Sequence, residues 1–594
     1  MIEPIAPLAP ATPLQGPRVS STALVAVPEA LALRPAMHGA RQFIVQFTVG
    51  TALPDGDEID CSPETLAGVF PDDVLRSLTF STATAWLARL YPRDLAAALD
   101  EQAASLPDDT LWPDLRRPGF SRYYRLRFTG GPDNGYILDT LSRAATVSAA
   151  QLELAVVPLA SAVKHADPEY ANQHYLQAAP KGISVESAWN EGAGGAGITV
   201  SLAEHGGPPS SHNDIAFRKP LAVGATFSEH MVNVSAIMVA KDNADGIVGV
   251  SPISGAALFA AIDALPPPPS KSKVEIGVTG ALALLAAPGV LSAGDVVNMS
   301  IGALVELDQK AQPNIVKGFK KAPFGSTWQK VFATVPVEFD AAVIAVVRQL
   351  VARGITVCVS AGNGYEATYT LKGNLLRANT GQGAELAGPW VGQTHSLDRA
   401  NPNALVDGGA VVVTGGSWSP SKSANERNLN FNFGTRVDCF ARGDDVLTWY
   451  TNSVKAAGGS SVAAPIVTGA AALVQCYLKQ NYQATLKPLV LRALLSDPLL
   501  NTPAQPNDRI GVMPNLAKIF PLLKTTPFTK AALAAAIKSQ AGKLRAGATT
   551  PAQPSAPSAS GPWVHDPYRT WDESAKKWVQ MALDKEEDVF QAAP

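Results

Sequence analysis

The chain has 594 residues, of which 46% are hydrophobic and 17% are charged, and its formal net charge is -3 at pH 7. A single domain usually stops growing near ~250 to 300 residues, so we expect two or more folded units. No basic excess or long basic run is present, which excludes nucleic-acid and membrane-surface binding as functions. The most apolar stretch, Gly280 to Leu291, contains Pro288 and is shorter than the ~20 residues that a membrane span needs.

The first residues, 1–38, are rich in Pro and Ala without a sustained period, which predicts a flexible N-terminal arm. They lack the basic and then apolar order of a secretory signal. We therefore expect a cytoplasmic protein, or one exported by a route that uses no standard signal peptide. The cysteines have neither the paired spacing of a zinc site nor that of a short disulfide framework, so reduced thiols are expected at Cys61, Cys358, Cys439 and Cys476.

Residues 39–165 have the pattern of a small α+β domain. Phe43 to Phe47 and Tyr123 to Phe128 alternate like strands, and Pro92 to Ala104 predicts a helix. We interpret residues 166–181 as a linker to the next unit.

Residues 182–525 alternate apolar runs bounded by glycine with helical patterns, which indicates a parallel sheet covered by helices. Ala341 to Arg353 places its apolar residues on one helical face, as a crossover helix requires. A second helix is predicted from Val462 to about Leu478. The strand candidates are Ile198 to Ala203, Ala256 to Ile262, Asp295 to Ile301, Ile355 to Ser360 and Ala410 to Thr414.

Residues 526–594 are predicted to form a C-terminal extension. The low-complexity sequence of Thr550 to Gly561 is typical of a linker. The apolar residues beyond it fall near helical spacing, which predicts an amphipathic tail helix. We expect this tail to dock on its own chain, and docking on a partner protein is the alternative. These apolar residues are Trp571, Ala575, Trp578, Met581 and Leu583.

A glycine-rich turn followed by a helix start offers a candidate nucleophile. Acyl transfer requires an activated hydroxyl, a base, an acid that orients the base, and donors for the oxyanion. Ser461 lies where the N–H groups of a first helical turn point toward a developing charge. The stretch Gly459 to Pro465 resembles the Gly-Thr-Ser-x-Ala-x-Pro motif of subtilisin-like serine peptidases. That resemblance implies that Ser461 is the nucleophile, whereas a serine at a helix start is otherwise an ordinary cap.

Two further stretches resemble motifs of the same family. Ala361-Gly362-Asn363 is similar to the strand-end motif whose Asn amide donates to the oxyanion, which implies that role for Asn363. A turn residue is the alternative for this Asn. The stretch from Asp295 to Gly302 resembles the strand whose edge pairs with the substrate backbone, so the implied substrate-binding residues are Ser300, Ile301 and Gly302.

The base and the acid follow from the same resemblance. The segment after His230 resembles the family's His-Gly-Thr-x-Val-Ala-Gly helix, with Met231 and Val232 in place of small residues. It implies that His230 is the general base. Glu204 ends a predicted buried strand where the family usually has Asp, and Asp214 is the alternative acid. The chain order of acid, base and serine is that of subtilisin-like triads.

The resemblance implies an α/β fold, a subtilisin-like three-layer sandwich with a mostly parallel central sheet, preceded by a small α+β propeptide-like domain. It implies a serine endopeptidase that acts on polypeptides through an acyl-enzyme, made as an autoinhibited precursor and processed near residues 160–180. A permanent accessory domain is the alternative for the N-terminal unit. The alternative is a pseudopeptidase that serves as a binding scaffold. We expect no cofactor, while calcium stays open because the family often binds it. The loop from Asp242 to Asp245 is the one short acidic loop worth checking for calcium, and a solvated turn is its first interpretation.

Overall fold

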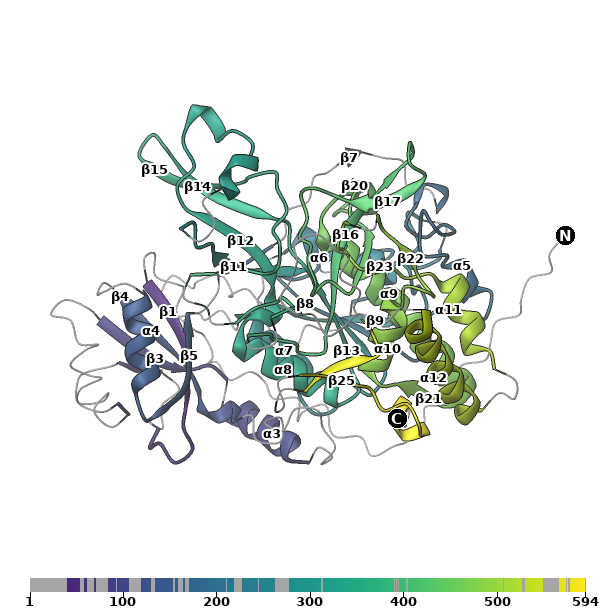
Figure 1. Ribbon diagram of the computed structural model, residues 1–594, viewed down its shortest axis with the longest axis horizontal. Helices are drawn as coiled ribbons and strands as arrows, with labels where there is room; N and C mark the ends of the chain where they lie inside the picture. The colour runs from purple at the N-terminus through teal and green to yellow at the C-terminus, as the bar shows by residue number, and fades with distance from the viewer. Residues whose placement is uncertain are drawn as a thin grey trace.

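Figure 1 shows the computed structural model of the chain. The predicted N-terminal arm, Cys61, Ala575 and the low-complexity linker fall outside the residues that the structure describes, and those predictions stay open. The described part runs from residue 40 to residue 592 except for 54–57, 61–68, 71–83, 92, 106–118, 130–133, 153–154, 159–163, 166–169, 210, 218–226, 244, 262–276, 311–313, 389, 392, 394, 402–403, 506, 526–528, 548–565, 573 and 575–576.

A nine-stranded sheet forms the centre of the molecule, in the order β22-β23-β18-β16-β13-β10-β8-β9, with β17 beside β16. The strands from β23 to β9 run parallel, while β22 and β17 are antiparallel to their neighbours. All five predicted strands are confirmed. The strands are β8 (Thr199–Glu204), β9 (Gly255–Ala261), β10 (Val296–Met299), β13 (Thr356–Ser360), β16 (Val411–Ser419), β17 (Ala424–Arg427), β18 (Cys439–Arg442), β22 (Thr502–Pro503) and β23 (Val512–Met513).

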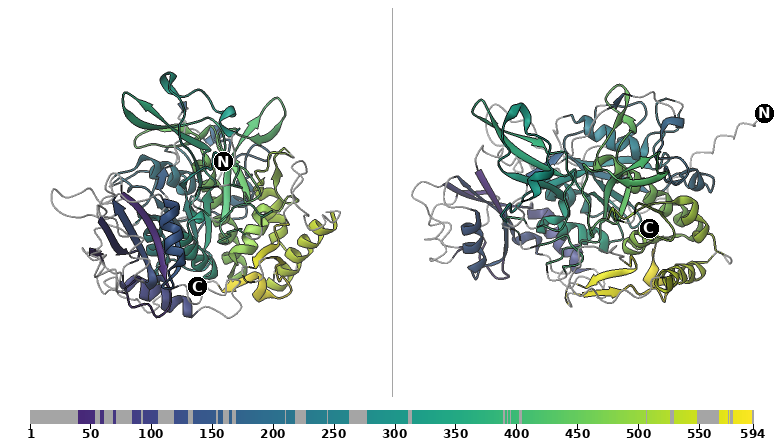
Figure 2. Two further views of the ribbon diagram at one scale, coloured as in Figure 1. Left: turned by 60° about the vertical axis from the view of Figure 1, so that its left-hand side comes forward. Right: turned by 45° about the horizontal axis from the view of Figure 1, so that its top comes forward.

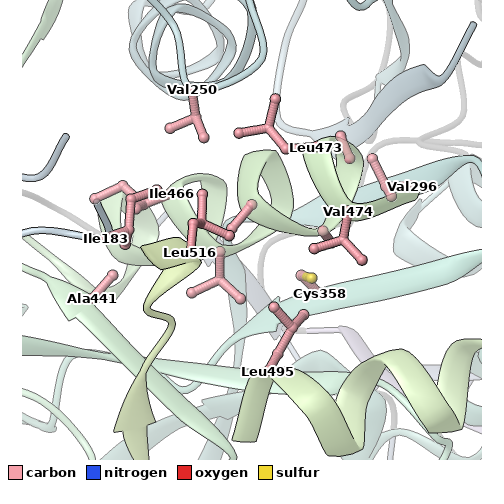
Figure 3. Packing of buried hydrophobic residues seen from close by; sticks show 14 of the residues in the cluster. Ile183, Val250, Val296, Cys358, Ala441, Ile466, Leu473, Val474, Leu495 and Leu516 are labelled. Atoms are coloured by element: carbon pink, nitrogen blue, oxygen red, sulfur yellow. The ribbon is translucent and has the colours of Figure 1, made fainter. Parts of the chain in front are cut away.

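Helices cover both faces of this sheet, because its strands are apolar on both sides. Val296 and Cys358 face a core that contains α6 and α9, whereas Val297 and Val357 face a second core that contains α7 and α8. Figure 3 shows the first of these cores around Cys358. The three-layer α/β prediction is confirmed. The helices are α5 (Glu186–Trp189), α6 (Glu229–Val239), α7 (Gly277–Ala286), α8 (Ala341–Ala352), α9 (Ser460–Tyr482), α10 (Pro488–Ser496), α11 (Leu516–Leu523) and α12 (Lys530–Gly547).

Helix α9 runs through the first core. Within the described residues it is the one helix long and apolar enough to cross a membrane, and its whole apolar window is buried inside the protein. Burial of this kind is what the core helix of an α/β domain requires.

The N-terminal unit is an antiparallel sheet in the order β2-β3-β4-β1-β5 with a helix packed on one face. Its other face joins the core of α7 and α8. Hydrogen bonds fasten it there: among them, the hydroxyl of Tyr91 donates to the carbonyl of Ala342 at 3.2 Å, and the Gln349 amide donates to the carbonyl of Leu99 at 3.0 Å. The elements are β1 (Ala40–Phe47), β2 (Glu58–Asp60), β3 (Thr84–Arg89), β4 (Tyr123–Thr129), β5 (Val147–Leu152), α3 (Arg93–Ala104) and α4 (Asn134–Arg143).

Two smaller sheets lie at the carboxyl edge of the central sheet. One has the order β15-β14-β12-β11-β6 and projects at the upper left of Figure 1. The other has the order β19-β20-β7. Their strands are β6 (Ala155–Pro158), β7 (Lys164–His165), β11 (Ile301–Glu306), β12 (Val331–Pro336), β14 (Tyr365–Leu371), β15 (Asn374–Asn379), β19 (Val446–Trp449) and β20 (Val454–Ala457).

The C-terminal tail is not the predicted amphipathic helix. Trp571 and Trp578 lie opposite each other in a hairpin of β24 (Arg569–Asp572) and β25 (Lys577–Gln580), with ring centroids 5.4 Å apart. The tail docks on its own chain, as expected, because β26 (Phe590–Ala592), which follows the short helix α13 (Glu586–Val589), pairs with β21 (Ala484–Leu486). Figure 2 shows this last segment lying beside the rest of the C-terminal region.

Candidate active site

Three neighbouring parallel strands, β8, β10 and β13, bring three of the predicted site residues to one edge of the sheet. Glu204 ends β8, Ser300 follows β10, and Asn363 follows β13. In open α/β sheets the crevice at the carboxyl ends of the strands is where ligands bind. The order of the strands in the sheet therefore explains why residues far apart in sequence meet here.

Ser461 is the second residue of α9 and is fully buried. The preceding Gly459 has a φ of 141° and a ψ of 159°, a conformation that is open essentially to glycine alone. Pro465 has no N–H to donate to the carbonyl four residues earlier, which is that of Ser461. The hydroxyl of Ser300 replaces this donor at 2.7 Å. The missing N–H of Pro465 and the hydroxyl of Ser300 thus act together, because the hydroxyl holds the Ser461 carbonyl that the proline cannot bond.

The structure brings His230 and Glu204 together. Nδ1 of His230 lies 3.1 Å from Oε2 of Glu204, whose side chain is 1% exposed. The other carboxylate oxygen of Glu204 accepts from the backbone N–H of His205 at 2.8 Å, which holds the carboxylate in place. His230 lies in the first turn of α6, which is capped by Ser228. Among the described residues, neither ring nitrogen of His230 nor Oε2 of Glu204 makes a hydrogen bond of regular geometry, so the 3.1 Å contact is an approach within ion-pair distance between two buried groups.

The alternative acid, Asp214, lies elsewhere. Its carboxylate accepts from the indole N–H of Trp449. Desolvation by burial raises the pKa of Asp214 to about 6, while the Trp449 hydrogen bond opposes that shift. The geometry therefore pairs the imidazole with Glu204.

Met231 and Val232, the bulky residues after the histidine, are fully buried in the core of α6 and α9. Their side chains pack inward, so their bulk is accommodated by the core.

Asn363 is held through the oxygen of its side-chain amide and through its main chain. The backbone N–H of Ser460 lies 2.8 Å from Oδ1 of Asn363. Because a backbone N–H can only donate, the atom that faces it must be the oxygen, and Nδ2 must point the other way. A Cβ built on Gly459 would lie 3.3 Å from this Nδ2 and 2.9 Å from Oγ of Ser461. The glycine thus leaves open a space that the amide and the serine hydroxyl share.

The loop that carries Asn363 is fastened by residues that the sequence motifs did not single out. The side chain of Asn432 donates to the carbonyl of Ala361 at 2.7 Å and accepts from the N–H of Gly364 at 2.9 Å. The hydroxyl of Thr334 accepts from the N–H of Asn363 at 2.9 Å. A polar residue inside an otherwise apolar, buried run is the one signal that could have indicated such roles.

The predicted substrate-binding residues divide into two kinds. The side chain of Ser300 turns inward to the carbonyl of Ser461 and also accepts from Asn298 at 2.9 Å. The backbones of Ile301 and Gly302 lie in β11, which pairs antiparallel with β6 of the N-terminal region.

Within the described residues, no group of three or more His, Cys, Asp or Glu side chains could hold a metal ion. In the loop from Asp242 to Asp245, the side chain of Asn243 accepts from the N–H of Asp245 at 3.1 Å, which is an ordinary turn interaction. Calcium binding was left open by the sequence and stays open.

The fold and the order of the site residues define an α/β protein of the subtilisin-like class. A sequence model of the Subtilase family, Peptidase_S8, matches residues 210–512, about half of the chain. The chain therefore belongs to the subtilase family. The matched range contains His230, Asn363 and Ser461 and begins after Glu204.

Solved protease structures resemble the chain at low identity. Fervidolysin from Fervidobacterium pennivorans, a keratinolytic enzyme related to subtilisin, is 13% identical with a TM-score of 0.42, and the alignment covers 81% of this chain and 61% of fervidolysin. A protease from Pseudoalteromonas arctica PAMC 21717 is 17% identical with a TM-score of 0.37, over 61% of this chain and all of that one. The prenylagaramide maturation protease PagA is 16% identical with a TM-score of 0.36, over 57% of this chain and 98% of PagA. A comparison with curated proteins finds no match.

Proposed function

We propose that the chain is a serine endopeptidase that hydrolyses peptide bonds in polypeptides through an acyl-enzyme. Ser461 is the nucleophile, His230 the general base, Glu204 the acid that orients it, and Asn363 the oxyanion donor. The 3.1 Å contact between Nδ1 of His230 and the buried carboxylate of Glu204 is the observation that supports this proposal most. A carboxylate on Nδ1 selects the tautomer whose Nε2 can accept a proton.

In the proposed reaction, Oγ of Ser461 attacks the carbonyl carbon of the scissile bond while its proton passes to Nε2 of His230. The negative charge moves to the carbonyl oxygen, where Nδ2 of Asn363 donates a hydrogen bond. The imidazolium is stabilised by Glu204 and returns its proton to the leaving amine. Water then hydrolyses the acyl-enzyme by the same route, with the imidazole again acting as base.

Hydrolysis of an unfolded protein substrate tests this function. After limited proteolysis between residues 160 and 180, the chain should release new α-amino groups, and Ser461→Ala treated in the same way should do so at a rate lower by several orders of magnitude, since the nucleophile is lost. Ser496→Ala serves as a matched control, because within the described part of the chain its hydroxyl bonds only to backbone carbonyls of its own helix, those of Arg492 and Ala493. Equal rates for the parent and for Ser461→Ala would contradict the proposal.

A binding scaffold without turnover is the second candidate. It is favoured by the replacement of the usual Asp with Glu204 and by the absence, within the described residues, of a hydrogen-bond partner for Nε2 of His230. Long or misaligned hydrogen bonds are nevertheless common in substrate-free sites and tighten only in the complex. A folded chain that cleaves no protein after its N-terminal region has been removed would favour the scaffold.

The precursor form also belongs to the proposal. Pro158 and Val157 of β6 pair with Ile301 and Gly302 of β11, which is the edge that a substrate strand needs. A strand edge accepts one partner at a time, so β6 excludes substrate until it leaves. We expect processing between residues 160 and 180, part of which lies outside the described residues. Intact mass should show two fragments for the parent and one uncut chain for Ser461→Ala. An uncut parent that is fully active would remove autoprocessing.

A further inference from the structure

A buried serine at the end of β13 has no part in the chemistry described so far. Ser360 is fully buried, and its Oγ lies 2.7 Å from Oγ of Ser460. The backbone N–H of Gly362 donates to the same Ser460 oxygen at 3.2 Å. Ser460 in turn lies 2.7 Å from Oδ1 of Asn363. Four groups are therefore joined in one chain of hydrogen bonds that ends on the oxyanion donor.

The donor and acceptor capacities of these groups fix the direction of each hydrogen bond in the row. Oδ1 of Asn363 can only accept, so the single hydroxyl proton of Ser460 is committed to it. The oxygen of Ser460 can then act only as an acceptor toward its other neighbours. Ser360 must therefore donate to Ser460, and Ser460 must donate to Asn363.

The main chain of Asn363 is fixed independently. Its N–H donates to Thr334 at 2.9 Å, and its carbonyl accepts from the side chain of Asn379 at 3.0 Å. The remaining freedom is rotation of the side-chain amide. Two donors from Ser460, its N–H and its hydroxyl, hold Oδ1 and so aim Nδ2 at the space beside Ser461.

We infer that Ser360 is a positioning residue for the oxyanion donor, acting through Ser460 on the amide of Asn363. Hydrogen bonds in a row polarise one another, so the bond from Ser360 strengthens the one from Ser460. It also leaves the Ser460 hydroxyl a single orientation. The inference rests on the proposed peptidase function, and it adds a residue from the middle of the sheet to that machinery.

Ser360→Ala tests the inference on the full chain. Loss of one net hydrogen bond corresponds to a fall of about 3- to 10-fold in kcat with KM within about 2-fold, since the amide acts in the transition state. Ser201→Ala is the matched control. Ser201 is another fully buried strand serine of the same sheet, and it donates to the carbonyl of Val296 at 2.9 Å. That variant should lose stability without a matching fall in kcat.

A double-mutant cycle separates positioning from general loosening of the fold. In an Asn363→Ala background the amide is absent, so Ser360→Ala should change kcat by less than about 1.5-fold. An unchanged kcat in Ser360→Ala, an equal fall in Ser201→Ala, or a full effect that persists without the amide would each overturn the inference. A parent that has no turnover at all would instead overturn the proposed function and the inference with it.

Discussion

Glutamate at position 204 is the proposed acid of this site, at a position where the resemblance to the family leads us to expect aspartate. The carboxylate still reaches Nδ1 of His230, at 3.1 Å, while its second oxygen is held by the N–H of the next residue. A side chain one methylene longer than aspartate therefore occupies its place without leaving the end of β8. The acid of the triad acts on the tautomer and charge of the imidazole, so the extra length matters only through the position of the carboxylate.

Substitutions of Glu204 should show directly whether its carboxylate acts as the acid of the triad. Glu204→Ala is expected to lower kcat by roughly 10⁴-fold, a magnitude taken from the acid of related triads. Glu204→Asp should keep part of the rate, because its carboxylate remains but falls short of the imidazole. Steady-state kinetics on a peptide ester would measure both. A parent-like rate in Glu204→Ala together with loss of the rate in Asp214→Ala would show that Asp214, and not Glu204, is the acid.

Asp214 predicts a pH dependence of stability. Its folded pKa, raised to about 6 mainly by desolvation, lies above its ordinary value of 3.8. The folded state therefore holds the proton longer, and the free energy of unfolding should fall as the pH rises from about 4 to about 6 and then level off. Asp214→Asn removes this titration and should flatten the profile in that window. Urea unfolding between pH 4 and pH 8 measures it, and parallel profiles for both proteins would contradict the assignment.

Ser461, His230, Glu204 and Asn363 could be proposed from sequence because each is part of a local motif, and their catalytic roles stay predictions. The residues that hold them could not. Thr334, Asn432 and Ser360 reach the site through contacts between segments that no local pattern connects.

At the scale of elements, a side chain from outside α9 replaces a hydrogen-bond donor that the start of this helix lacks, and this replacement can be tested. Pro465 leaves the carbonyl of Ser461 without a helical donor, and Ser300 supplies one. Ser300→Ala should therefore cost about 1 to 3 kcal/mol of unfolding free energy, because the buried carbonyl loses its donor.

The same loss should be smaller in a Pro465→Ala background, since the new N–H at position 465 can bond the Ser461 carbonyl within the helix. Chemical denaturation of the four proteins of this cycle gives the coupling. Equal costs of Ser300→Ala in both backgrounds would show that the two residues act separately.

The strands and the tail show why element prediction succeeds and fails. Apolar runs between glycines predicted the parallel strands, because such strands are buried on both faces. Trp571 and Trp578 are seven residues apart. This spacing fits two turns of a helix, and it fits equally well two opposite positions in a short hairpin. Spacing alone could not distinguish these two structures, and the pairing across β24 and β25 decided the outcome.

At the scale of the whole molecule, the N-terminal unit and the central sheet share an apolar core along α7 and α8. The unit is thus bound by more than its pairing of β6 with β11. Release of a processed N-terminal fragment therefore requires exposure of this shared surface, which by the proposal would delay the appearance of activity after cleavage of the chain.

Covalent labelling of Ser461 tests the central claim most directly. The full chain, before and after limited proteolysis between residues 160 and 180, would be treated with a fluorophosphonate probe and read by intact mass. The account predicts a single adduct on Ser461 that forms faster after cleavage and is absent in Ser461→Ala and His230→Ala. A folded, cleaved protein that takes up no probe, or that labels equally in His230→Ala, would contradict it.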